Sequence, residues 1–109
     1  MGKHTATWKA HERATARLLG GQRVGPTGRP APDVVSDWAA VECKSRKTLP
    51  AWLKDAVAQS EAAAISFTSP RLPVTVLHEV GGRHADDLCV MPMSAFAAWF
   101  GEWRDAQDD

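Results

Sequence analysis

The chain has 109 residues, which is enough for one domain with one hydrophobic core and too few for two ordinary domains. No run approaches the roughly 18 apolar residues of a membrane span, no secretion signal begins the chain, and Cys43 and Cys89 lie far apart, so we expect free thiols in a cytoplasmic protein with no membrane partner. The formal net charge is zero, but residues 1–55 hold ten Lys and Arg against five Asp and Glu. This asymmetry is explained equally well by a basic surface that contacts phosphates and by ordinary solvated helix faces.

The first predicted element is a helix over about residues 7–19, which the pair Gly20-Gly21 ends. One face of this helix should pack inward, because four residues recur on it at i, i+4, i+7 and i+11: Trp8, Glu12, Thr15 and Leu19. A carboxylate, that of Glu12, therefore lies in the middle of an inward face. A basic stripe runs beside it: Lys9, Arg13 and Arg17.

Further elements follow from apolar runs and from Gly and Pro punctuation. We predict a short strand over residues 22–24, a Pro- and Gly-rich loop over 25–32, strands over 32–35 and 38–44, a helix over 49–64 capped by Thr48, strands over 73–78 and 87–91, and a last helix from Ser94. Trp8 and Trp52 fall on predicted buried helix faces and should pack in the core. The order of elements predicts an α/β fold with a central mixed β-sheet flanked by helices.

Polar chemistry concentrates on the strands over 32–35 and 38–44. Alternation along a strand places Glu42 and Lys44 on one surface and Cys43 on the other. Two carboxylates, Asp33 and Glu42, and an ammonium on adjacent strands cost stability unless something compensates for them. A divalent cation would compensate, and Mg²⁺ needs only one or two carboxylates plus a carbonyl such as that of Cys43.

These groups suit phosphodiester hydrolysis. A bound divalent cation activates water and neutralises charge on a phosphoryl oxygen. Lys44 could orient the attacking water or stabilise the transition state, and Glu12 could bind the metal's water shell or a second cation.

The pattern Pro32-Asp33 followed by Glu42-Cys43-Lys44 resembles the PD-(D/E)XK nuclease superfamily. Together with His11-Glu12-Arg13, Arg23 and Thr27-Gly28, it is similar to the archaeal type of Holliday-junction resolvase and its small phage relatives, in which Ser usually stands at the position of Thr27. The likeness covers roughly residues 8–65. It implies a restriction-endonuclease-like α-β-β-β-α-β-β-α core and an Mg²⁺-dependent endonuclease, with Mn²⁺ as a substitute, acting on branched DNA.

By this resemblance Asp33 and Glu42 would be metal ligands, Lys44 the catalytic lysine and Glu12 the supporting carboxylate. Gln59 is similar to a helical glutamine that touches the water or the lysine in some branches. The candidates for DNA contact are Arg13, Arg17, Arg23, Thr27, Arg29, Arg46 and Lys47. Arg46 and Lys47 suit backbone phosphates, although an ordinary solvated loop explains them as well.

Several alternatives stay open. An Asp near a Glu-x-Lys arises by chance in many proteins, where the charges simply face water. The histidines and cysteines show no C-x-x-C or H-x-x-x-H spacing, so zinc is not favoured. Besides a junction resolvase, the chain could be a nuclease for other DNA ends, flaps or RNA, a catalytically silent binding protein, or a structural subunit that docks through its Trp-rich last helix.

Two expectations concern assembly and setting. Because resolution of a junction needs two symmetric cuts and two-fold dimers are the commonest oligomers, we expect a homodimer. An Ala- and Arg-rich composition and small size suit a phage of a GC-rich bacterium.

Overall fold

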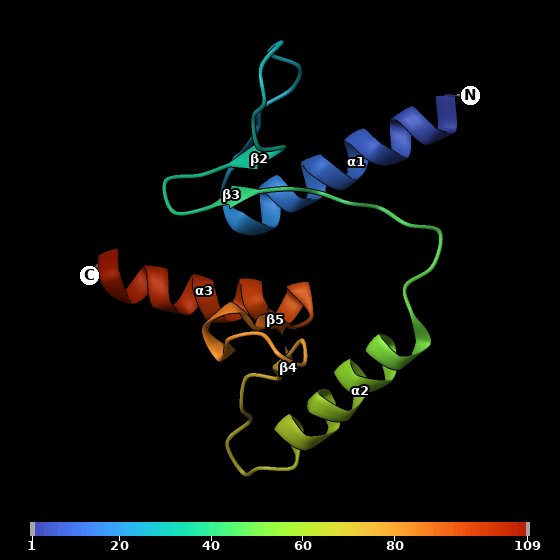
Figure 1. Cartoon of the computed structure of the whole chain (residues 1–109). Helices are drawn as coiled ribbons and strands as arrows, with labels where there is room; N and C mark the ends of the chain where they lie inside the picture. The colour runs from blue at the N-terminus through green and yellow to red at the C-terminus, as the bar shows by residue number, and fades with distance from the viewer. Residues whose placement is uncertain (1, 109) are drawn as a thin grey trace. The chain divides into compact units, whose positions relative to one another are not determined.

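The computed structural model describes residues 2–108 and contains three helices and two small antiparallel sheets (Figure 1). The elements in order are α1 (Gly2–Leu19), β1 (Gln22–Arg23), β2 (Val34–Val35), β3 (Ala40–Val41), α2 (Ala51–Ile65), β4 (Thr75–Leu77), the 3₁₀ turn η1 (His84–Asp86), β5 (Leu88–Val90) and α3 (Met93–Asp108). This confirms the predicted order and the general α/β class. α2 begins at Ala51 rather than at Leu49, and Pro50, with its extended ψ, occupies the N-cap position in place of the predicted Thr48.

The chain divides into two compact units, unit 1 over residues 1–47 and unit 2 over residues 48–109. Unit 1 contains α1 and the antiparallel sheet β1-β2-β3, and unit 2 contains α2, the hairpin β4-β5 and α3. Each sheet therefore lies within one unit. A single mixed sheet and a restriction-endonuclease-like core stay predictions, as does a single domain.

The end of α1 is fixed by two glycines, as predicted. The Gly20 N–H donates to the Arg17 carbonyl at 3.5 Å and the Gly21 N–H to the Ala16 carbonyl at 2.8 Å, while Gly20 has φ 66°, which is the Schellman pattern. A Cβ on Gly21 would lie 2.6 Å from the Val35 carbonyl oxygen. The chain can therefore turn from α1 into the sheet only because residue 21 has no side chain.

The core of unit 1 lies between α1 and the sheet. Ala16, Val34 and Cys43 form a buried cluster, with Val41 packed against it. The predicted inward face is confirmed at its three later positions, Glu12, Thr15 and Leu19. Trp8 is 42% exposed, so the prediction that it packs in the core is wrong. The apolar periodicity of α1 thus extends one turn further toward the N-terminus, to Trp8, than the part of the helix that the short sheet covers.

A β-bulge precedes β2. Val34 is the register partner of Val41, and the N–H of Asp33 also donates to the Val41 carbonyl, at 2.8 Å. Two consecutive residues of one strand thus face one residue of its partner, an arrangement that bends the strand and redirects a side chain. The bulge removes Asp33 from the simple alternation that the sequence predicts.

In unit 2, α2 contacts β4, and the Thr75 hydroxyl donates to the Ala56 carbonyl at 3.4 Å. Among the described residues of unit 2, two have buried side chains: Ala64 and Phe100. Trp52 is exposed in the first turn of α2, so its predicted core position is also wrong. A cavity of about 510 Å³ lies between residues 70–73 and α3.

Candidate active site

A cleft of about 390 Å³ lies between α1 and the Pro- and Gly-rich loop of unit 1. Trp8 and Glu12 line it from α1, Thr27 and its neighbours line it from the loop, and Asp33 lines it where the loop enters β2. Two of the predicted site carboxylates therefore share one cleft. The loop turns at Gly25 and Gly28, each with φ 74°, which glycine adopts readily.

Glu12 is the most deeply buried charged side chain described, with 2% of it exposed. Its Oε1 accepts a hydrogen bond from Arg23 Nε at 2.6 Å, and the Arg23 guanidinium lies 5.6 Å from the centroid of the Trp8 ring. Within residues 2–108, Glu12 Oε2 is buried and has no hydrogen-bond partner. Burial of an unpaired polar oxygen costs free energy, so this atom is suited to a cation or a donor that enters the cleft.

Asp33 is half-buried and anchored to the strand that carries the predicted Glu-x-Lys motif. Its Oδ2 accepts the backbone N–H of Cys43 at 2.8 Å. Cys43 is itself buried in the core, between Glu42 and Lys44 in the sequence. The hydrogen bond therefore holds one predicted ligand next to the backbone that bears two further site residues.

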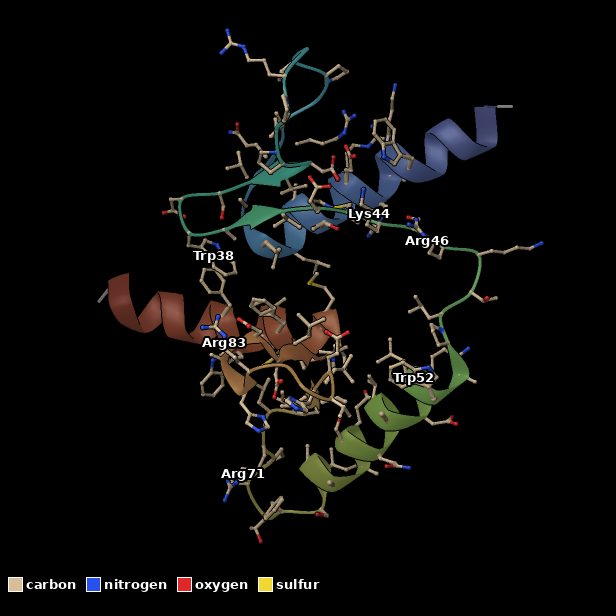
Figure 2. The ribbon with its side chains drawn as sticks, viewed as in Figure 1. Trp38, Lys44, Arg46, Trp52, Arg71 and Arg83 are labelled. Carbon is tan, nitrogen blue, oxygen red and sulfur yellow. The ribbon has the colours of Figure 1, made fainter. Side chains whose placement is uncertain are left out.

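Glu42 and Lys44 lie on the outer surface, as alternation predicts. Lys44 Nζ is 3.6 Å from Glu42 Oε2, and their side chains are 68% and 59% exposed. Figure 2 shows Lys44 and Arg46 on the segment that follows β3. Ser45 and His11 hydrogen-bond through Oγ and Nδ1 at 2.9 Å, which ties this segment to α1 one residue from Glu12.

Unit 1 places its four predicted site residues in two pairs: Glu12 and Asp33 line the cleft, whereas Glu42 and Lys44 pair on the exposed surface and are not among the residues that line it. The carboxylate oxygens of Glu12, Asp33 and Glu42 are not all within 4.8 Å of one another. Among the described residues, one group of three potential metal ligands meets this distance, and it lies in unit 2. Gln59 is exposed on α2 in unit 2, and its role stays a prediction.

The predicted DNA-contact residues differ in their freedom to contact DNA. Arg13, Arg17, Arg29, Arg46 and Lys47 are exposed. Arg23 binds Glu12, and the Thr27 hydroxyl donates to the Arg29 carbonyl at 3.0 Å within its own turn. Thr27 is exposed as well, but its hydroxyl already hydrogen-bonds within its own turn, so the five exposed basic residues are better placed for phosphate contact than Arg23 and Thr27.

One cluster was not found from the sequence. His78, His84 and Asp87 gather in unit 2, with one potential ligand atom from each within 4.8 Å of the others. The sequence contains no zinc motif here. The features that could have indicated the cluster are the cross-strand register, which places His78 opposite Asp87, and the i,i+3 spacing of His84 and Asp87.

Comparisons of the chain with protein-family models, curated proteins and solved structures found no match. Among the described residues, no helix combines the length and apolar character that a membrane crossing needs.

Proposed function

We propose that the protein is a metal-dependent DNA endonuclease that selects branched DNA in the manner of a Holliday-junction resolvase. The observation that carries the proposal is the buried, unpartnered Oε2 of Glu12 in a cleft that Asp33 also lines. A hard cation bound in a cleft that two carboxylate residues line would relieve the desolvation cost of a buried, unpaired carboxylate oxygen. The neighbouring Glu42 and Lys44 complete the motif expected from the resemblance.

The donor set fits Mg²⁺ or Mn²⁺, because it consists of oxygen atoms. Asp33, Glu42, the Cys43 carbonyl and Glu12 are the groups that would hold the ion. The ion would supply an activated water and neutralise charge on the phosphoryl oxygens. The chain's own contribution is to place an ammonium, that of Lys44, beside Glu42, where it can orient the nucleophile or stabilise developing negative charge.

Exposed basic residues support DNA as the substrate. The stripe of Arg13 and Arg17 on α1 and the pair Arg46 and Lys47 after β3 belong to the same unit as the cleft. Charges of this kind position a nucleic acid through its backbone phosphates without reading its sequence. Two symmetric cuts at a junction would be made by a homodimer, in a host cell's cytoplasm if the protein is of phage origin.

The test is a cleavage assay on labelled four-way junctions, flaps, duplex, single-stranded DNA and RNA, with Mg²⁺ or Mn²⁺ titrated from zero. Wild type should cut the junction in a metal-dependent manner, and Asp33→Asn and Glu42→Gln should each reduce the rate at least about a hundredfold. Asp55→Asn and Glu61→Gln, which change exposed acids of α2, are the matched controls and should retain full activity. Equal cleavage by Glu42→Gln would refute the mechanism, and preference for another substrate in the panel would replace the junction.

A second candidate is a DNA-binding protein of the same kind that does not cleave. It is favoured by the ion pairs that already occupy Glu12 and Glu42, with Arg23 and Lys44 respectively. In that case junction binding would persist in excess chelator, and no substrate would be cut at any metal concentration. Sedimentation of the protein alone and with DNA would test the dimer.

A further inference from the structure

The hairpin of unit 2 brings a histidine and a carboxylate face to face. The register of β4 and β5 pairs Leu77 with Leu88, and one more step places His78 opposite Asp87. Side chains directly opposite each other on antiparallel strands share one face. Accordingly, His78 Nδ1 lies 2.6 Å from Asp87 Oδ1.

A second histidine reaches the same carboxylate by a different route. His84 begins η1, and the Asp87 N–H donates to the His84 carbonyl at 3.1 Å. Side chains three residues apart on a 3₁₀ turn lie above one another. His84 Nδ1 is therefore 3.3 Å from Asp87 Oδ2, and the rings of His78 and His84 stack with centroids 4.2 Å apart.

Backbone and side-chain contacts preorganise the loop between these residues. The Gly82 N–H donates to the Glu79 carbonyl at 2.9 Å and the Asp86 N–H to the Arg83 carbonyl at 3.0 Å. The Arg83 guanidinium also donates two hydrogen bonds to the Asp86 carboxylate, at 3.0 and 3.1 Å. Because the loop is already ordered, a ligand that binds this cluster would pay little conformational entropy for ordering it.

We propose that His78, His84 and Asp87 form a binding site for a zinc-class transition-metal ion. Two imidazole nitrogens and one carboxylate are a donor set suited to Zn²⁺ or Co²⁺, whereas Mg²⁺ takes oxygen ligands. The three candidate ligand atoms lie within 4.8 Å of one another. Tetrahedral coordination would then be completed by water or by an exogenous ligand.

The state of the cluster before metal arrives also favours the proposal. Asp87 is only 14% exposed, and both histidines contact it through Nδ1, so the three groups already converge on one point. A metal that enters would replace two histidine–carboxylate contacts with three metal–ligand bonds and separate the ligand atoms slightly. The site is independent of the proposed nuclease function, since it lies in unit 2 and uses different donor chemistry.

The experiment uses the full chain without an affinity tag, stripped with chelator and then titrated with Zn²⁺ by calorimetry and with Co²⁺ by visible absorption. Wild type should bind one Zn²⁺ at micromolar or tighter Kd and give the intense visible bands of tetrahedral Co²⁺. His84→Ala and Asp87→Asn should each weaken binding by tenfold or more. His11→Ala is the matched control and should bind Zn²⁺ like wild type.

Folding must be separated from ligation. His84 is 86% exposed, so its removal should leave the circular dichroism spectrum and metal-free melting temperature unchanged even if Asp87→Asn perturbs the hairpin. Wild-type binding weaker than millimolar, or unchanged Zn²⁺ affinity in His84→Ala, would overturn the proposal. Loss of Zn²⁺ binding in Cys89→Ser with full binding in His84→Ala would also overturn it and assign the exposed thiol instead.

Discussion

In unit 1 the carboxylate of Glu12 is buried by segments that are distant in the sequence, whereas in unit 2 Asp87 meets two histidines within a single hairpin. Glu12 on α1 pairs with Arg23 on β1, and its other oxygen is left without a partner among the described residues. Asp87 is instead contacted through both of its oxygens by His78 and His84. A site built from distant segments depends on tertiary packing, and a site built within a hairpin depends mainly on register.

The comparison is tested most strongly by Arg23→Met, which leaves Glu12 buried and unpaired. Breaking a buried ion pair costs about 3–5 kcal/mol, and because Arg23 is partly exposed we expect destabilisation at the lower end, about 3 kcal/mol. Hydrogen exchange should show the loss in α1 and β1–β3 and not in β4–β5. The control is Arg29→Met, at an exposed position of the loop, which should have little effect.

A double variant separates the charge from the packing. Glu12→Leu combined with Arg23→Met removes both charges and should recover much of the lost stability. If the single variant Arg23→Met is as stable as wild type, Glu12 does not depend on its partner and the cleft is wetter than its burial indicates.

The second prediction concerns zinc and unit 2. At a free Zn²⁺ concentration one hundred times the Kd, binding to the native hairpin should stabilise it by about 2.7 kcal/mol. Amides of β4, η1 and β5 should exchange more slowly, with those of α1 unchanged, and His84→Ala should abolish the difference. Protection that spreads equally over both units would show that the ion binds elsewhere as well.

The third prediction compares close packing at a glycine in each unit. In Gly21→Ala the new methyl group would lie 2.6 Å from the Val35 carbonyl oxygen, so backbone must shift and we expect a cost of about 2 kcal/mol. In Gly82→Ala the nearest atom, the Glu79 carbonyl oxygen, is at 3.2 Å, and the cost should be well below 1 kcal/mol. Chemical denaturation of both variants measures the two values, and equal costs would contradict the tight turn after α1.

Local patterns predicted the order of elements and the inward position of Glu12, because apolar periodicity and glycine stops act over a few residues. They did not predict that Trp8 is exposed, since periodicity does not reveal where a short sheet ceases to cover a helix. The bulge at Asp33 was equally hidden. It depends on the Asp33 N–H bonding to the carbonyl of Val41, which is already the register partner of Val34. No residue type in the sequence indicates this bond.

The two polar sites differ in the same respect. Glu12, Asp33, Glu42 and Lys44 were proposed as a site from the sequence because a motif spacing and a family resemblance pointed to them. His78, His84 and Asp87 were passed over because fixed zinc spacings do not describe a cluster formed by cross-strand register and a 3₁₀ turn. A prediction of the β4–β5 register would have placed His78 opposite Asp87.

The smallest expected effect on stability comes from Lys44→Met, and it is the most informative for function. The Lys44–Glu42 pair is exposed, and exposed pairs contribute little, so the free energy of unfolding should change by less than about 0.5 kcal/mol. If Lys44 acts on the reacting phosphate, junction cleavage should nevertheless fall at least about a hundredfold, while the binding of junction DNA stays within a fewfold of wild type. Lys54→Met, at an exposed position of α2, should leave both unchanged. A parallel loss of stability and cleavage would mean that Lys44 holds the fold of the segment after β3, whereas loss of cleavage alone would place its ammonium in the chemical step.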